Sequence, residues 1–441
     1  MSTPSSRPSY AAVLRVPHAR RTFAAALVGR LSYGTVSLAL MLSLTRSSGS
    51  YAVAGLVMAL FGATSVFLSP YRASLVDRHG PRRALLPMAL LYAALLCVLA
   101  EACRRPGTPE AVLAVTAALA GACTPPLGPT MRAVWARLLP DRALLQRAYS
   151  LDGVAEELLF VSGPLLVGAL VAVAPPVAGV VLSAVLVAAG TLAFVTSPMT
   201  AAPGPDGRQK NDGPAPEGRA EGRAEGRAEG QVRALLQPVV VAAAVGVSVS
   251  AVDLLVVAYA GERDLGGGAV AWVLAALSAG SAVGGLVNGA VAWSSPTRAR
   301  LPFFAAGLGL CLVAAGLAPG LGTLVPAVMC AGLFVAPALT TAYLIADEGA
   351  APGFRVRAGA WCNTAVNAGG SAGAAAVGLL VERLPLPVCF AVSGAVAAAA
   401  ALVPGHRRGG PARRAGLISR RRSRASRPSR ASRRSRVSGR P

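Results

Sequence analysis

The stretch YRASLVDRHGPRR, residues 71–83, is a short, strongly basic connection between two apolar runs near 51–71 and 84–102. Gly80 followed by Pro81 is typical of a tight turn. Asp77 lies among the basic residues, where its carboxylate can pair with an arginine or with the positive N-terminus of a helix. The alternative interpretation is a basic loop in which the acid is incidental.

Apolar runs continue on both sides of this connection. A helix that crosses a bilayer needs about 20 predominantly apolar residues. Twelve such runs are present, at 22–44, 51–71, 84–102, 111–131, 150–173, 175–198, 234–259, 268–292, 301–318, 321–345, 357–381 and 384–403. We therefore predict an all-α membrane protein with twelve transmembrane helices. The first run is too long for a signal peptide and contains Arg30, so we expect it to be retained as a span.

The composition supports this prediction. Hydrophobic residues make up 54% of the 441 residues, charged residues only 14%, and the mean hydropathy is +0.57. Lipid is therefore the expected main solvent. Lys210 is the single lysine beside 41 arginines, and Ala, Val and Gly are abundant. This bias is typical of a GC-rich genome, such as that of an actinobacterium.

Histidine and cysteine placement argues against catalytic and metal sites. The seven cysteines are scattered singly, without a C-x-x-C pair, which indicates neither a disulfide framework nor a zinc site. His18, His79 and His406 all lie outside the apolar runs, which excludes a histidine relay within the membrane. We expect no metal and no cofactor. A membrane enzyme would need a cluster of catalytic groups, and we expect the chain not to be an enzyme.

The runs divide into two sets of six around a polar segment. We predict two six-helix halves, 22–198 and 234–403, and a disordered cytoplasmic linker at 199–233. The linker contains three Glu-Gly-Arg-Ala repeats and no apolar face, so it cannot bury enough surface to fold. Residues 1–21 and 404–441 are predicted as cytoplasmic tails.

The C-terminal tail contains 14 arginines and no acid. We expect it to be disordered and to lie on anionic membrane lipid, although an extension without function is an alternative. Its arginines are not interleaved with aromatic residues, so we expect no nucleic-acid partner.

Loop charges predict the orientation. If the N-terminus is inside, 22 lysines and arginines lie in inner segments even without the C-terminal tail, against five in outer loops. Because basic loops remain on the cytoplasmic side, we predict that both termini are cytoplasmic. The expected location is the bacterial inner membrane.

Within residues 71–83, four positions match the signature Gly-x-x-x-Asp-Arg-x-Gly-Arg-Arg: Asp77, Arg78, Gly80 and Arg82. Ala73 replaces the leading glycine, and Arg83 follows one place beyond a basic position that is Pro81 here. In this signature and in its 6 + 6 layout, the chain resembles the major facilitator superfamily. The resemblance implies two halves that rock around a central cavity. It also implies that Asp77 holds the halves together on the cytoplasmic side and releases them during transport.

Further segments are similar to exporters of that superfamily. Gly163-Pro164, with Gly168, resembles their Gly-Pro motif, and a bent, closely packed helix at the seam between halves would suit a gate. A purely structural kink is the alternative. Residues 125–135 resemble the inner end of helix 4 in efflux-type members. Trp293 occupies the acid position in the second-half repeat of the loop motif, so we expect an asymmetric closure.

Inserting an ionisable side chain into the centre of a membrane span costs about 2.5–3.5 kcal/mol, so each such residue needs an explanation. Arg30 lies in the first span, where it either reaches back to the interface or lines the cavity. Asp253 lies in the seventh span, nearer the outer side, where it either carries a proton, faces a cationic substrate or binds another polar group.

The fifth and eleventh spans add further candidates for a substrate or proton pathway. Asp152 and Glu156 share a helix face, with Glu157 beside them. Acids this close repel each other when ionised, which favours proton binding by at least one of them. The alternative is pairing with Arg132, Arg137 or Arg147. The eleventh span carries Asn363 and Asn367 at the same spacing.

From these features we predict secondary active transport, with proton-coupled export of a small hydrophobic or drug-like molecule by alternating access. The expected partners are that molecule, protons and membrane lipid, and we expect a monomer. One alternative is an importer or facilitator of the same fold. The alternative from another class is a membrane sensor or enzyme.

Overall fold

The computed structural model describes residues 9–105, 107–201, 217–264, 267–351 and 353–405, and these residues contain helices and no strands. All of the helices belong to one compact unit, which ends at Pro404. The C-terminal tail predicted to be basic and disordered lies outside the described residues from 406 onward, as does 202–216 of the predicted linker.

The N-terminal half contains ten of the helices. They are α1 (Tyr10–Arg15), α2 (Ala19–Ser48), α3 (Tyr51–Phe67), α4 (Ser69–His79), α5 (Pro81–Arg104), α6 (Glu110–Cys123), α7 (Leu127–Leu138), α8 (Arg142–Val171), α9 (Val177–Val195) and the single turn α10 (Pro198–Ala201). Within this half α2 packs on α9, α3 on α6, and α5 on both α6 and α9.

The C-terminal half contains α11 (Glu217–Glu262), α12 (Gly267–Ala290), α13 (Thr297–Gly316), α14 (Leu321–Gly349), α15 (Arg355–Val381) and α16 (Leu386–Ala401). Its main pairs are α11 with α15, α12 with α14, and α13 with α14 and α16. Because α11 begins at Glu217, helix covers 217–233, where the sequence predicted a disordered linker. Glu, Arg and Ala in the repeats have good helix propensity, which is compatible with extending the apolar helix that follows.

Ten helical segments of the described chain are long and apolar enough to span a membrane. One of these joins α6 and α7, and an eleventh is the pair α3 and α4, bent by 42°. The last predicted run forms α16, which has only 16 residues. Pro385 precedes this helix and Pro404 follows it, and proline favours such boundaries because it has no N–H to donate.

Glycines allow the closest helix contacts. A Cβ atom added at Gly280 would lie 2.1 Å from the Met329 carbonyl oxygen of α14, and one at Gly284 would lie 2.1 Å from that of Leu333. Since no side chain fits at these distances, α12 and α14 can approach only through glycine. Gly280 and Gly284 are thus the positions at which α12 packs closely on α14.

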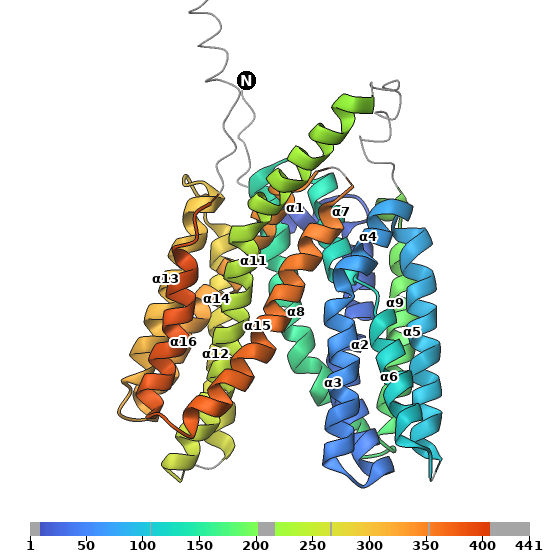
Figure 1. Cartoon of the computed structure of the whole chain (residues 1–441), viewed down its shortest axis with the longest axis vertical. Coiled ribbons are helices and arrows are strands. Elements are labelled where there is room, and N and C mark those ends of the chain that lie inside the picture. The colour runs from blue at the N-terminus through green and yellow to red at the C-terminus, as the bar shows by residue number, and fades with distance from the viewer. Residues whose placement is uncertain (1–8, 106, 202–216, 265–266, 352, 406–441) are drawn as a thin grey trace, which may run out of the picture. The chain divides into compact units, whose positions relative to one another are not determined.

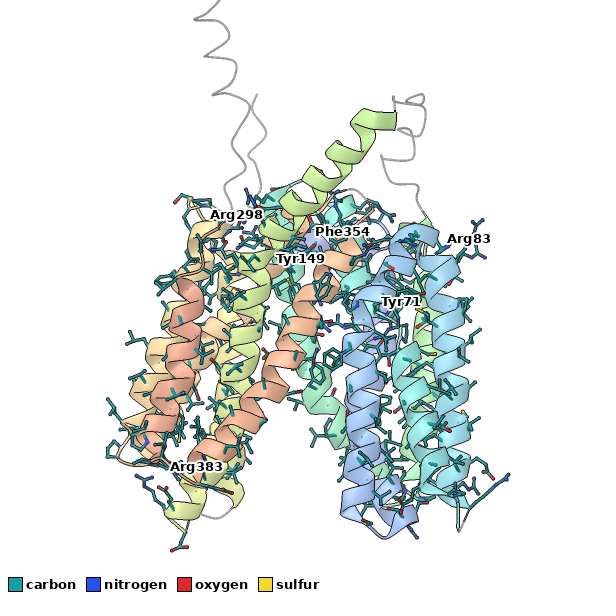
Figure 2. The ribbon with its side chains drawn as sticks, viewed as in Figure 1. Tyr71, Arg83, Tyr149, Arg298, Phe354 and Arg383 are labelled. Carbon is teal, nitrogen blue, oxygen red and sulfur yellow. The ribbon has the colours of Figure 1, made fainter. Side chains whose placement is uncertain are left out.

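The two halves contact each other toward one end, which we call the closed end and which carries Asp77, Phe354 and Arg298. Figure 2 shows Phe354 and Arg298 near this end and Arg383 at the opposite end. The contacts between halves join α4, α7 and α8 to α12, α14 and α15. Toward the opposite end the two groups of helices separate (Figure 1).

Candidate functional site

A cavity of about 820 Å³ lies between the two halves. Both halves line it, through residues of α2, α3, α7 and α8 on one side and of α11, α14 and α15 on the other. Most of the lining is apolar or aromatic, including Tyr33, Phe61 and Phe160. The charged residues that line it all come from the N-terminal half: Arg30, Arg72, Arg132, Glu156 and Glu157.

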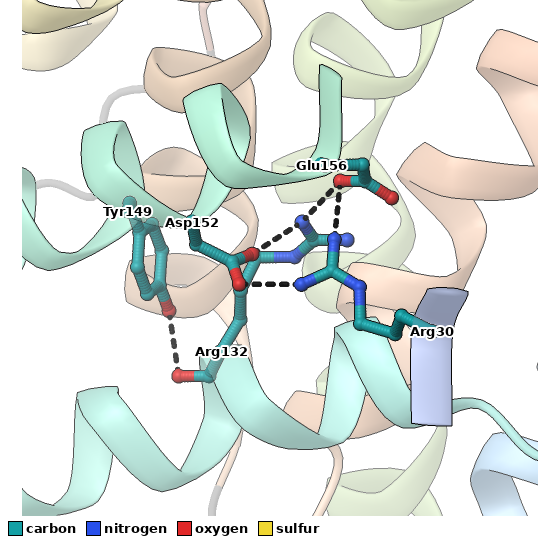
Figure 3. Close-up of polar contacts among 5 residues, drawn as sticks. All are labelled: Arg30, Arg132, Tyr149, Asp152 and Glu156. Carbon is teal, nitrogen blue, oxygen red and sulfur yellow. Dashed lines mark hydrogen bonds and ion pairs between the residues drawn. The ribbon is translucent and has the colours of Figure 1, made fainter. Parts of the chain in front are cut away.

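Four charged side chains form one buried cluster beside this cavity (Figure 3). Arg30 lies 2.6 Å from Asp152 and 2.8 Å from Glu156. Arg132 lies 3.0 Å from Asp152 and 3.3 Å from Glu156. Each carboxylate therefore contacts two guanidinium groups, and the two positive and two negative charges balance.

Burial differs among the members of this ionic cluster. Asp152 has no exposed surface and Arg30 is 3% exposed, whereas the Glu156 side chain is 29% exposed. The cluster connects α2, α7 and α8. It also extends to α14, because the Arg132 guanidinium lies 3.9 Å from the centre of the Tyr343 ring, a cation–π contact.

This geometry separates the alternatives left open by the sequence. Arg30 lines the cavity and binds acids instead of reaching back to the interface. Asp152 and Glu156 are not a repelling pair, because arginines lie between them. Of the basic partners expected at the inner surface, Arg132 binds the acids, whereas Arg137 donates to the Met199 carbonyl. Arg147 likewise donates to backbone carbonyls, those of Ala143 and Ala290.

Glu157 has different surroundings from Glu156. Its Oε1 accepts a hydrogen bond from the Ser281 hydroxyl of α12, so the contact joins the two halves. Its Oε2 is buried without a hydrogen-bond partner, and no ion pair to it is found among the described residues. Glu157 is thus a cavity-lining carboxylate that pairs with no arginine in the described part of the chain.

The C-terminal wall offers neutral polar groups. Asn363, Asn367 and Ser371 follow one another at four-residue spacing on α15, and all three line the cavity. The side-chain amide of Asn367 donates to the backbone carbonyl of Asn363 at 2.8 Å, and the Ser371 hydroxyl donates to the backbone carbonyl of Asn367 at 3.1 Å. The predicted polar face of the eleventh span therefore faces the cavity.

Asp253 does not join this site. It lies on α11 three residues beyond Ser250, which lines the cavity, but Asp253 itself is exposed and is not part of the lining. The described residues give it no hydrogen bond or ion pair. At a helical spacing of three residues it lies about one turn nearer the opposite end. The two predictions that it faces the substrate or binds another polar group are therefore not supported by its position.

Asp77 joins the halves at the closed end. Its carboxylate accepts hydrogen bonds from the backbone N–H groups of Val356, at 3.2 Å, and Arg357, at 2.9 Å. These groups lie in the first turn of α15, whose N-cap residue Phe354 provides no side-chain acceptor. Asp77 thus supplies the missing cap from the other half, at the positive end of the helix dipole.

The rest of the loop signature fulfils other needs. Gly80 ends α4 with φ of 80°, a conformation that glycine adopts without strain, and its N–H donates to the Val76 carbonyl. Arg78, Arg82 and Arg83 are exposed, and the structure shows no side-chain contact of theirs with the other half. The small Ala73, where the signature has glycine, is fully buried.

A second group closes the other side of the interface. Gln146 of α8 donates from its amide nitrogen to the Asn288 carbonyl and accepts from Arg300 at 2.9 Å. Arg142 lies 2.5 Å from Glu348. Trp293 carries no charge and instead donates to the Asn288 carbonyl at 3.2 Å. The expected asymmetry between the two sides is met in the structure.

The Gly-Pro motif has a different neighbour from the one expected. A Cβ atom at Gly163 would lie 2.4 Å from the Gly34 backbone, so this glycine brings α8 against α2 of the same half. It is not at the seam between halves. Pro164 lies within α8, which continues to Val171, and Gly168 has no atom within 4 Å of a Cβ position. The sequence motif does not predict which helix Gly163 contacts, because that depends on how α8 is rotated about its axis in the fold.

Several residues of the interface were not predicted as site residues. Gln146, Arg142 and Glu348 lie in no motif, and Ser281 is one hydroxyl among many. Arg72, which lines the cavity, was also not predicted, although two prolines of the sequence indicate that a donor such as Arg72 is needed nearby. Pro125 and Pro126 lack the N–H groups that would bind the carbonyls four residues earlier, so a nearby donor is needed.

The sequence profile of the Major Facilitator Superfamily matches residues 22–374, and the chain belongs to this superfamily. The fold is similar to that of the fucose:proton symporter of E. coli (TM-score 0.62, 16% identity, 86% of this chain and 97% of that one). It is also similar to the human organic anion transporter MFSD10 (0.64, 13%, 88% and 99%).

A third similar structure is a bacterial homologue of the iron transporter ferroportin in its outward-facing state (0.68, 13%, 87% and 97%). No curated protein sequence matches the chain. Family membership and these transporter folds indicate a multi-pass membrane transporter and not an enzyme. Among the described residues, no group of three or more His, Cys, Asp and Glu side chains is placed to hold a metal ion.

Proposed function

We propose that this protein is a proton-coupled exporter of small, largely hydrophobic molecules that works by alternating access. The observation that supports this most directly is the cavity of about 820 Å³, which both halves line and whose wall contains the unneutralised Glu157. The volume lies within the range of about 300–1,000 Å³ found for sites that hold drug-sized ligands.

The orientation follows from charge. Basic loops prefer the cytoplasmic side, and the basic loop that contains Asp77 lies at the closed end. The proposed location is therefore the bacterial inner membrane with both termini cytoplasmic, and the structure then corresponds to an outward-open state. The similarity to a ferroportin homologue in an outward-facing state agrees with this assignment.

The lining supports an amphipathic cargo. Aromatic and apolar side chains provide most of the surface, and Asn363, Asn367 and Ser371 offer neutral hydrogen-bonding groups. In the ionic cluster, each charge is already balanced by a partner within the protein. A cargo with an apolar body and a few polar groups therefore gains contacts without competing against these ion pairs.

We assign the proton to Glu157 rather than to Glu156 or Asp253. Two arginines hold Glu156 in its ionised form. Glu157 has no ion pair among the described residues, and its Oε2 is buried without a hydrogen bond, so no cation holds its carboxylate in the charged form. Its hydrogen bond to Ser281 crosses between α8 and α12. Gain or loss of the proton there changes a contact that must break when the halves rock.

The test is transport in a host that lacks its major efflux pumps. We expect the chain to lower accumulation of at least one compound in a panel of amphipathic molecules, and to do so less when the proton gradient is collapsed. In Glu157→Gln, we expect the remaining export to be insensitive to the gradient. Glu110→Gln, an exposed acid at the opposite end of the same half, is the matched control and should behave as wild type.

If Glu157→Gln retains the full response to the gradient, the assignment of the proton is wrong. Uptake that persists without a gradient would instead support an importer or facilitator, an alternative favoured by the fold it shares with a fucose:proton symporter. No transport of any compound in either direction would contradict the proposed function itself.

A further inference from the structure

Arg72 is a buried arginine, 4% exposed, for which no carboxylate partner is found among the described residues. Its guanidinium instead donates to four backbone carbonyls. Nη1 lies 3.0 Å from the carbonyl oxygens of both Gly121 and Ala122 and 3.4 Å from that of Thr64. Nη2 lies 2.5 Å from that of Ser65.

These four carbonyls lie at the ends of two broken helices. Pro125 and Pro126 have no N–H, so the Gly121 and Ala122 carbonyls lose the donors four residues later, and Gly121 keeps a backbone bond from the Thr124 N–H at 3.3 Å. Thr64 and Ser65 lie in the last turn of α3, just before its bend into α4. Carbonyls at helix ends carry partial negative charge, which favours a guanidinium at this position.

The bend of the second span also meets the other half. Pro70 likewise removes the donor four residues after Val66, whose carbonyl accepts hydrogen bonds from the Leu68 N–H and, at 3.2 Å, from the Thr364 hydroxyl of α15. The tyrosine hydroxyl of Tyr33 donates to the Pro125 carbonyl at 2.5 Å. The two bends are therefore held side by side, with donors from the same half and one donor from the other.

Helix α4, which carries Arg72, contacts helices of both halves. α4 packs more extensively on α15 of the other half than on any helix of its own, and Asp77 binds the first turn of α15. When the closed end opens, α4 must separate from α15 and remain with the N-terminal half. The Arg72 hydrogen bonds to α3 and α6 are attachments to that half.

We infer that Arg72 is a positioning residue that fixes α4 to the bends of α3 and α6, so that Asp77 moves with the N-terminal half. The inference rests on the alternating access proposed above. It concerns which contacts break, not which molecule is carried. Its test needs neither the cargo nor a proton gradient, so its failure leaves the proposed direction, coupling and cargo untouched.

Cys123 reports on the bend. It is the last residue of α6, directly after Ala122, and its thiol is free and partly buried. We would measure its alkylation rate in the purified full-length protein by mass spectrometry of the separate peptides. The exposed Cys97 and Cys330 serve as internal references. Amide hydrogen exchange of Val356 and Arg357 reports in parallel on the Asp77 contact.

In Arg72→Met, we expect alkylation of Cys123 to accelerate by about tenfold, as loss of charge-assisted hydrogen bonds predicts, while the Val356 and Arg357 amides remain protected. In Asp77→Ala we expect the opposite: rapid exchange of those amides with the wild-type rate at Cys123. Arg72→Lys should be intermediate, because one ammonium cannot reach both helix ends. It also serves if the methionine variant does not fold.

Arg137→Met is the matched control, since Arg137 donates to the Met199 carbonyl away from the bends. It should leave both readouts at wild-type values. Unchanged reactivity of Cys123 in both Arg72 variants would overturn the inference. The inference would also be overturned if, in the Arg72 variants, faster alkylation of Cys123 came together with loss of amide protection at Val356 and Arg357. A general loosening of the fold, and not a change in the position of α4, produces that pattern.

Discussion

At Asp152, a carboxylate with no exposed surface binds two arginines from different helices. Its charge is tolerable there only because both guanidinium groups are present, since an unpaired buried charge is costly. The ionic cluster is therefore best understood as a connection among α2, α7 and α8. Its neutrality makes it a poor place to gain or lose a proton.

Replacing one member of the ionic cluster should destabilise the fold. For Asp152→Asn we expect a loss of about 3–5 kcal/mol, because two arginines keep their burial and lose a partner. Thermal unfolding in detergent measures this. The exposed pair of Arg105 with Glu101 is the control, and Arg105→Gln should cost no more than about 1 kcal/mol. Equal losses in the two variants would show that burial of the ionic cluster is not important.

Helices α2 and α8 approach each other through Gly34 and Gly163, whose backbones occupy the space of a side chain. For Gly163→Val we expect a loss of about 3 kcal/mol or more, because the added atoms meet backbone that cannot move aside. Gly168→Val lies five residues later in the same helix, in open space, and should cost far less. Folded yield and melting temperature measure both variants, and similar values would contradict this account of the contact.

The short helix α1 packs on α2 and α8 of the N-terminal half and contacts the other half through Tyr10. The Tyr10 hydroxyl donates to the Leu286 carbonyl of α12 at 2.5 Å, while Val13 is buried in the core of the N-terminal half. This contact strengthens the closed end, although the sequence predicted only a tail over 1–21. Its strength is that of one hydrogen bond, about 0.5–1.5 kcal/mol.

We therefore expect Tyr10→Phe to increase the open population of the closed end by up to about tenfold. The distance between labels at Arg82 and Ser295 measures it, since both are exposed there on opposite halves. Tyr71→Phe is the control, because Tyr71 is exposed and its hydroxyl has no described partner. A shift of equal size in the control would assign the effect to something other than the Leu286 contact.

For the whole molecule, two separate groups of side-chain contacts are prominent among those that join the halves at the closed end. Asp77 binds α15 on one side, and Gln146 binds the Asn288 carbonyl and Arg300 on the other. Neither group shares a residue with the other. Opening of this end must break both.

We expect Asp77→Ala and Gln146→Leu each to shift the closed end toward its open form, by about 0.5–2 kcal/mol for the lost cap and a similar amount for the lost amide contacts. In the double variant the two free-energy changes should add, since distant independent sites do. The same label distance measures all three proteins. A double variant no more open than either single one would mean that the two groups act as one.

The sequence by itself determined the membrane-helical class, the two sets of six apolar runs and the family. The length of an apolar run and the charge of a loop are local properties of the sequence, so they can be determined without knowing any tertiary contact. For Asp77 the sequence offered an arginine or a helix N-terminus as the partner, and the structure shows the N-terminus of α15.

Only the tertiary structure decided which polar groups meet. It placed Arg30 and Arg132 between Asp152 and Glu156, gave Glu157 no ion pair among the described residues, and put Gly163 in a contact within one half. It also brought Arg72 to the Gly121 and Ala122 carbonyls, some fifty residues away, whose donors four residues later are missing at Pro125 and Pro126. Such pairings depend on how the helices are rotated and bent relative to one another, and a hydropathy pattern gives neither the rotation nor the bend.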